Sequence, residues 1–115
     1  MKKFILSLTF LVLIGGFVSA QQLPKIHILN NTGYPIYEVY ISSSEDDYWG
    51  NDWLKGETIS SGTSREFTLP VALSVDNEYD FCLVDTDDDT YTKMNVKLTN
   101  GFIVEFTFDD FDDWD

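Results

Sequence analysis

Cysteine, histidine and basic residues are all scarce in this chain. Its 115 residues include one Cys, one His and 7 Lys+Arg against 20 Asp+Glu, which gives a formal net charge of −13. A single cysteine, Cys82, excludes the intramolecular disulfide framework that supports many small exported domains. Because an acidic surface repels phosphate, the composition also excludes a nucleic-acid partner. A chain of this size supports one hydrophobic core and therefore one domain.

A long apolar run occurs only at the beginning of the chain. Lys2 and Lys3 precede an apolar segment from Phe4 to Val18, and small residues at Val18-Ser19-Ala20 suit cleavage before Gln21. The run is too short, and wrongly flanked, for a stable membrane span. The sequence therefore predicts a signal peptide over residues 1–20, a mature domain over residues 21–115 with no membrane span, and a periplasmic or extracellular location.

No window of the mature chain sustains helical spacing of apolar residues, whereas two-residue alternation recurs. Turn residues separate the alternating segments, as in all-β domains. We expect a single antiparallel β-sandwich of about seven short strands, over Lys25 to Asn30, Ile36 to Ser42, Trp53 to Ile59, Ser64 to Leu69, Glu78 to Asp85, Thr90 to Leu98 and Phe102 to Phe108. Gly56 is expected to interrupt or bulge the third of these strands. Asn100-Gly101 predicts a hairpin between the last two strands.

The strand pattern also predicts which side chains face the core. Phe81, Leu83, Met94, Val96, Leu98, Phe102, Val104, Phe106 and Phe108 hold the apolar phase of three consecutive strands. If the strands run alternately up and down, the turns at 31–35 and 60–62, the loop at 85–90 and the tail at 109–115 share one end. The loops at 43–52, 70–77 and 99–101 then share the other end.

This arrangement gathers aspartates from the loop and the tail at one end. Asp85, Asp87 and Asp89 alternate along the loop, and the last strand delivers Asp109 and Asp110 to the same end. Short carboxylates at alternate positions are typical calcium ligands. A helix-loop-helix calcium site is excluded, because Thr90 and Val96 stand where that loop needs glycine and a bidentate glutamate. Two interpretations remain open: a Ca²⁺ site in a β-loop, or a solvated acidic fringe that protects strand edges.

A second cluster joins aromatic rings to acids over residues 45–54. Tyr48, Trp49, Asp52 and Trp53 could form a platform for a carbohydrate or a protein ligand, because ring faces stack on apolar surfaces and carboxylates accept hydrogen bonds. In the alternative interpretation, Trp53 closes one end of the sandwich and Trp49 covers a loop.

Motifs for catalysis are scarce. The chain lacks a nucleophile elbow, a phosphate-binding loop and a histidine-containing metal set, and Cys82 and His27 both lie in strand-like segments. The sequence therefore favours an exported non-enzymatic binding module, supported by calcium in one interpretation. An accessory envelope protein with a merely solubilising acidic surface is the alternative, and a small hydrolase comes third.

Three segments resemble a group of small exported bacterial β-domains. They are Asn30-Asn31-Thr32-Gly33, Trp49-Gly50-Asn51-Asp52-Trp53-Leu54 and the segment from Leu83 to Tyr91, which match the pattern NNTG…VYIS…WGxDWL…LVDxDxDTYT. The resemblance implies an exported β-fold and no established activity. The related pattern often has glycine where this chain has Asp88. Members are sometimes labelled argininosuccinate lyase, but such a lyase is a large helical tetramer with a serine-bearing loop, and none of it fits this chain.

Overall fold

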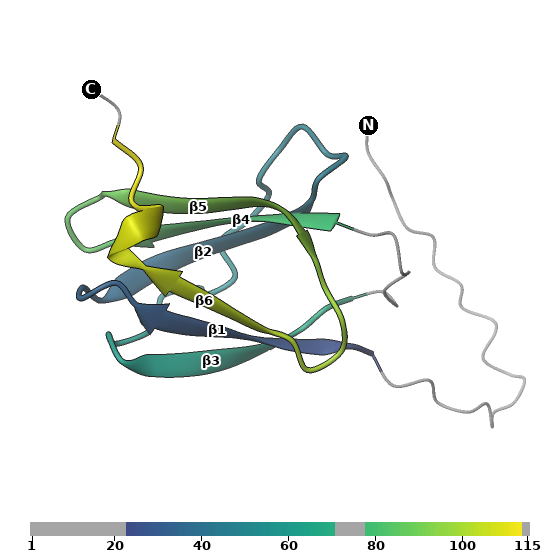
Figure 1. The fold of residues 1–115 in the computed structure, drawn as a ribbon, viewed down its shortest axis with the longest axis horizontal. Coiled ribbons are helices and arrows are strands. Elements are labelled where there is room, and N and C mark those ends of the chain that lie inside the picture. The colour runs from purple at the N-terminus through teal and green to yellow at the C-terminus, as the bar shows by residue number, and fades with distance from the viewer. Residues whose placement is uncertain (1–22, 71–77, 114–115) are drawn as a thin grey trace, which may run out of the picture.

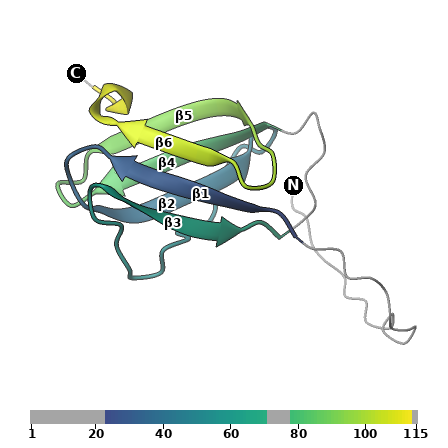
Figure 2. The ribbon, with the colours of Figure 1, turned by 60° about the horizontal axis from the view of Figure 1, so that its bottom comes forward.

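The computed structural model describes residues 23–70 and 78–113, which fold into two small β-sheets packed face to face (Figures 1 and 2). The elements are β1 (Lys25–Asn31), β2 (Ile36–Ser43), β3 (Thr63–Thr68), β4 (Glu78–Asp85), β5 (Thr90–Lys97), β6 (Ile103–Thr107) and a short 3₁₀ turn, η2 (Phe108–Asp110). The all-β sandwich is confirmed, with six strands instead of seven. The signal peptide predicted over residues 1–20 lies outside the described residues.

One sheet has the order β3-β1-β6 and the other has the order β2-β4-β5. All pairs are antiparallel except β1 and β6, which run parallel with Ile28 opposite Val104. Alternation explains the core: Ile26 and Ile28 are buried while Lys25 faces outward. Of the predicted core residues, Phe81, Leu83, Leu98, Val104 and Phe106 are buried, and Val96 is partly buried against them.

The predicted strand from Trp53 to Ile59 is wrong. Lys55 and Gly56 both adopt positive φ, 52° and 96°, so the interruption expected at Gly56 is a complete turn and no strand forms over this segment. The segment instead covers the free edge of β2: Trp53 N–H donates to the Val39 carbonyl at 2.8 Å, and Ile59 forms an isolated bridge with Ile36. Capping an edge in this way protects it against pairing with another chain.

The predicted hairpin at Asn100-Gly101 is also wrong, although a turn occurs there. Strands β5 and β6 belong to different sheets, because the turn binds β1 instead. The Lys25 carbonyl accepts from Gly101 N–H at 2.6 Å, and Lys25 N–H donates to Asn100 Oδ1 at 2.8 Å. These bonds place β6 beside β1, so the turn crosses from one sheet to the other (Figure 1).

Three core assignments fail near strand irregularities. Met94 is 57% exposed because Asn95, with φ 57°, forms a bulge that changes the facing of β5. Phe102 and Phe108 are 37% and 51% exposed, since β6 spans only Ile103–Thr107 and these two residues lie beyond its ends. The bulge is anchored by buried Asp80, whose Oδ1 accepts from Asn95 N–H at 2.8 Å.

The predicted division of loops between the two ends is confirmed where the structure describes them. At one end, Gly62 N–H donates to the Asn30 carbonyl, Thr86 N–H donates to the Pro35 carbonyl, and Asp112 N–H donates to the Thr90 carbonyl. At the other end, Ser44 N–H donates to the Glu78 carbonyl, so the loop after β2 meets the start of β4. The two acidic clusters of the sequence therefore lie at opposite ends of the sandwich.

Candidate functional site

A groove of about 530 Å³ lies where the loop after β2 passes the end of β3 and the start of β4. Its lining residues come from segments that are distant in the chain: Ile41 to Ser43, Glu45 to Asn51, Trp53, Leu69, Pro70 and Tyr79. We call this space the aromatic groove. The loop contributes Tyr48, Trp49 and Trp53, three of the four residues that the sequence suggested as a ligand platform.

Hydrogen bonds fix both ends of the loop. At its start, Ser44 Oγ donates to Asp80 at 2.6 Å, and Asp46 N–H donates to the Ser43 carbonyl at 2.9 Å. At its end, Asp52 Oδ1 accepts from Val39 N–H at 3.0 Å and from Leu54 N–H at 2.9 Å. Asp52 is thus a structural anchor outside the groove lining, and its predicted place in the platform is not supported by the geometry.

The three loop aromatics differ in burial. Trp53 packs on the core with its ring edge-on to Phe67, at a centroid distance of 6.0 Å, as the structural interpretation of Trp53 expected. Trp49 is half-buried, and Tyr48 is 75% exposed. The groove therefore has a fixed aromatic floor at Trp53 and an exposed aromatic rim at Tyr48. Large aromatic rings held in water at the mouth of a concave site are typical of binding surfaces.

The rim is also strongly acidic. Glu45, Asp46 and Asp47 are exposed and line the groove together with Tyr48. No Lys, Arg or His is among the lining residues that the structure describes. Within the same described part of the chain, no hydrogen bond or ion pair engages the carboxylates of these three residues. The described lining of the groove thus presents negative charge and contributes no cationic side chain to balance it.

At the opposite end, the predicted calcium ligands are only partly brought together. Asp85, Asp87 and Asp89 each offer an oxygen within 4.8 Å of the others. Asp85, 1% exposed, accepts from Asp87 N–H at 2.8 Å, from Asp89 N–H at 3.0 Å and from the Tyr91 hydroxyl at 2.8 Å. These three donors already stabilise the buried carboxylate, so the loop has a structural reason for its first aspartate.

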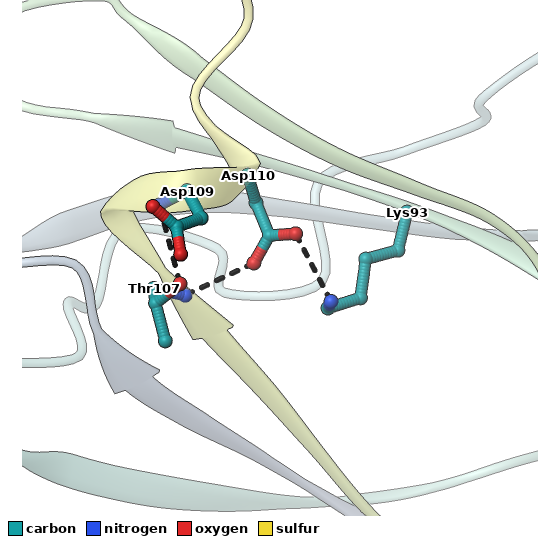
Figure 3. A network of polar contacts seen from close by, with 4 residues as sticks. All are labelled: Lys93, Thr107, Asp109 and Asp110. Carbon is teal, nitrogen blue, oxygen red and sulfur yellow. Dashed lines mark hydrogen bonds and ion pairs between the residues drawn. The ribbon is translucent and has the colours of Figure 1, made fainter.

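Of the two tail residues, Asp110 has its carboxylate engaged away from the loop, and Asp109 takes part through its backbone N–H (Figure 3). Asp110 accepts from Lys93 Nζ at 3.0 Å and from Thr107 N–H at 3.0 Å, while the Thr107 hydroxyl accepts from Asp109 N–H at 3.2 Å. This reciprocal capping box starts η2. Among the described residues, Asp109 and Asp110 do not join the group formed by Asp85, Asp87 and Asp89. The predicted calcium site is thereby reduced to its three loop carboxylates.

Electrostatics within the loop are unfavourable for a further negative charge. Partial desolvation, followed by the charges of Asp85, Asp87 and Asp88, raises the pKa of Asp89. Because the folded state then binds protons more tightly than the unfolded state, this contribution destabilises the protein at neutral pH and fades as the pH falls. Burial and the hydrogen bond to Asp85 also raise the pKa of Tyr91, which keeps its hydroxyl protonated.

Cys82 and His27 lie in different sheets, on β4 and β1. Burial raises the pKa of the Cys82 thiol, which lowers its thiolate fraction. His27 Nε2 lies 3.8 Å from a carboxylate oxygen of Glu66 on the neighbouring β3. This arrangement does not provide a Cys–His pair.

The sequence did not predict two features of the ends of the sandwich: one wall of the aromatic groove, and a hydrogen bond between β2 and the acidic loop. The wall formed by Leu69, Pro70 and Tyr79 comes from elements far from the loop, and no local pattern connects them. The hydrogen bond from the Tyr37 hydroxyl to Asp88 crosses from β2 to the acidic loop. The sequence predicts a strand over Ile36 to Ser42, which includes Tyr37, but only the folded turn brings Asp88 within hydrogen-bond distance of it.

Comparison with known proteins supports the fold and nothing finer. No family model matches the chain, and no curated protein matches it significantly. Among the described residues, no helix is long and apolar enough to cross a membrane. The chain is similar to a solved structure described as the NMR structure of the protein from Eubacterium rectale, with a TM-score of 0.54 and 13% identity over 80% of this chain and 91% of that chain. At this identity the likeness shows a shared fold alone.

Proposed function

We propose that this chain is an exported, non-enzymatic binding module whose ligand occupies the aromatic groove. One observation supports the proposal above the others: Tyr48 is 75% exposed at the mouth of a groove of about 530 Å³ that also holds Trp49 and Trp53. A groove of this size is in the usual range for small ligands and for short segments of a larger partner. Leaving a large ring in water has no folding benefit, whereas a ligand that covers it would gain contact area.

A binding role agrees with the chemistry of the remaining residues better than catalysis does. The groove offers carboxylates and aromatic rings, and it contains neither Cys82 nor His27 among its lining residues. Perturbed carboxylate pKa values are the usual mark of general acid–base chemistry. Asp89, whose pKa is raised, lies in the loop at the other end of the sandwich. Export rests on the sequence of residues 1–20.

Ligand titration of the mature protein tests this proposal. The chain has three tryptophans, at 49, 53 and 114, so in a Trp114→Phe background selectively excited tryptophan fluorescence reports on the two groove indoles alone. The panel is a set of neutral and amino-sugar oligosaccharides and a set of short acidic, neutral and basic peptides, followed by fluorescence and by backbone amide shifts. We expect at least one class to shift the signals of Tyr48, Trp49 and Trp53 saturably.

A matched pair of tyrosine variants controls the experiment. Tyr48→Ala should abolish that binding, while Tyr34→Ala, at an exposed tyrosine of the opposite end, should leave it unchanged. If no member of the panel shifts the groove signals, the binding proposal fails. The alternative of an accessory envelope protein with a solubilising acidic surface would then be favoured.

A further inference from the structure

We infer that the ligand of the aromatic groove is a basic peptide segment that inserts a lysine or arginine side chain between the loop aromatics and the acidic rim. This inference rests on the proposed function and adds the chemical class of the partner. The ligand is a segment of another exported or surface-exposed protein. The acidic rim of the groove calls for its positive charge, and the length of the groove beyond that rim suits an extended backbone.

The carboxylates of the groove differ from most others in the described structure. Elsewhere, Asp52 accepts two backbone N–H groups, Asp110 pairs with Lys93, and Glu57 pairs with Arg65. Glu45, Asp46 and Asp47 stand consecutively on the rim, and no donor from the described residues engages their carboxylates. A neutral ligand that covered this rim would desolvate carboxylates without pairing them, which is costly. A cationic ligand would supply the missing charge and donors.

The aromatic residues of the groove also favour a cationic ligand. The face of an indole or phenol ring attracts an ammonium or guanidinium group, and this attraction grows when the pair is removed from water. Trp49, Trp53 and Tyr48 lie beside the three carboxylates in one groove. A guanidinium can stack on a ring and donate to a carboxylate at the same time, because its donors lie in its plane.

Two further facts favour a peptide over a small free cation. Three consecutive carboxylates present more charge than one ammonium group can match, and the groove continues from the rim to Leu69, Pro70 and Tyr79. These apolar residues can contact the backbone or a neighbouring side chain of an extended segment. In addition, a chain with a formal net charge of −13 attracts a multiply charged partner over long range and so accelerates encounter.

The probes are capped peptides of alternating glycine and arginine, matched peptides with glutamine in place of arginine, and ethylguanidinium as a small free cation. Neutral oligosaccharides form the last arm. All are titrated into the mature protein in chelator at about 0.15 M salt, where long-range interactions between exposed charges are largely screened. We expect saturable shifts at Tyr48, Trp49 and Trp53 with the arginine peptide, and binding at least about ten-fold weaker for the glutamine peptide and for ethylguanidinium.

A matched pair of charge variants distinguishes binding at the groove from non-specific attraction to an acidic protein. Glu45→Gln/Asp46→Asn/Asp47→Asn should weaken the arginine peptide at least about ten-fold, because it removes the rim charge but keeps its shape. Asp87→Asn/Asp89→Asn/Asp109→Asn removes the same formal charge at the other end and should change affinity less than about two-fold, because screening acts over that distance. Both triple variants alter only exposed positions, and their melting temperatures check the fold.

The outcomes distinguish the two levels of the proposal. Saturable binding of oligosaccharides or neutral peptides at the groove, without preference for arginine, overturns the cationic partner but keeps the binding function. Tighter binding of ethylguanidinium than of the arginine peptide overturns the peptide assignment. Equal loss in both charge variants reduces the interaction to non-specific attraction and overturns the inference. Absence of groove binding by every probe removes both the inference and the proposed function.

Discussion

Asn30 joins three segments through one fully buried side chain. Its amide nitrogen donates to the carbonyls of Tyr34 at 2.8 Å and Ile59 at 2.9 Å, and its oxygen accepts from the Thr32 backbone at 3.0 Å and the Thr32 hydroxyl at 2.8 Å. Both donors and both acceptor positions of the amide are therefore used. This residue fixes the turn after β1 and ties it to the end of the segment that covers β2.

Replacing Asn30 by alanine should be strongly destabilising. Asn30→Ala removes four hydrogen bonds from a fully buried side chain. The Thr32 N–H loses its acceptor, whereas the Ile59 and Tyr34 carbonyls keep only the Ile36 N–H and the Thr32 hydroxyl. Each lost bond contributes about 0.5–1.5 kcal/mol, and a buried donor left without an acceptor costs about 1–3 kcal/mol. We expect a loss of about 3 kcal/mol or more in the free energy of unfolding, measured by denaturant titration. Its neighbour Asn31 is the control, because it is exposed and makes one surface hydrogen bond, to Glu105. Asn31→Ala should change stability by under about 1 kcal/mol, and equal losses would contradict this role for Asn30.

Asp88 combines an unusual backbone conformation with a cross-strand contact. Its φ is 66°, a left-handed conformation that glycine adopts without strain. Aspartate is tolerated there, and its carboxylate accepts from the Tyr37 hydroxyl. That hydrogen bond, with smaller effects of desolvation and neighbouring charge, raises the pKa of Tyr37 to about 12.

Removal of the Asp88 carboxylate should return the pKa of Tyr37 towards its ordinary value near 10.0. Titration of Asp88→Ala, followed by nuclear magnetic resonance of the tyrosine rings, measures the change. Tyr40 is an internal control, because its pKa is also raised to about 12, by a hydrogen bond to Glu38. Because the pKa of Tyr37 is higher in the folded state, its protonated hydroxyl stabilises the folded protein. In the wild type this contribution to the free energy of unfolding is complete below pH 10 and disappears as the pH rises through 12. A Tyr37 titration that Asp88→Ala leaves unchanged would contradict the contact.

At the scale of elements, the predictable strands were those whose alternation is uninterrupted. Strand β1 buries Ile26, Ile28 and Asn30 in strict alternation, so its pattern is visible in the sequence. The pattern of β5 was misread near its middle, because Asn95 adds a bulge whose anchor, Asp80, comes from another strand. The segment from Trp53 to Ile59 has apolar residues at strand-like spacing but also a turn with positive φ at Lys55. The bulge in β5 depends on a long-range contact that local periodicity does not contain, whereas Gly56 already marks the interruption of the other segment in the sequence.

The acidic loop between β4 and β5 permits a direct test of the calcium interpretation. In chelator, Asp87→Asn should raise the melting temperature, because it relieves repulsion on Asp85 and Asp89 and keeps the N–H donated to Asp85. Calcium should raise the melting temperature of the wild type and have a smaller effect on Asp87→Asn. At about one hundred times its dissociation constant, calcium would stabilise the wild type by about 2.7 kcal/mol if it binds only the folded form.

Magnesium and a second aspartate provide the controls for this loop. Magnesium should stabilise less than calcium at the same ionic strength, since it is smaller and dehydrates reluctantly. Asp109→Asn should leave the calcium effect intact, because Asp109 lies outside the group of three loop carboxylates. Equal effects of both metals on the wild type and on Asp87→Asn would identify the loop as a solvated acidic fringe.

At the scale of the whole molecule, the sequence predicted the sandwich and the separation of the loops into two ends, but not the sheet order. The two acidic clusters lie at opposite ends because successive segments of the chain run in alternating directions. This alternation does not depend on which strands are neighbours in a sheet. The parallel pairing of β1 with β6 depends instead on how the turn at Asn100 binds Lys25. The groove was only half predictable for the same reason: its aromatic loop is local in sequence, whereas its opposite wall at Leu69 and Tyr79 is assembled by the fold.

The sandwich is stable only if the two sheets stay packed, and Phe106 of β6 tests that interface. It is 0% exposed, its ring meets Phe81 of the opposite sheet at a centroid distance of 6.4 Å, and Lys93 Nζ lies 5.5 Å from its centre. Phe106→Ala should lower the free energy of unfolding by about 3–5 kcal/mol, because the cavity lies between rigid sheets that cannot close around it. Phe108→Ala, at a ring that is 51% exposed, is the matched control and should cost clearly less. Comparable melting temperatures for the two variants would mean that β6 does not face the core in this register.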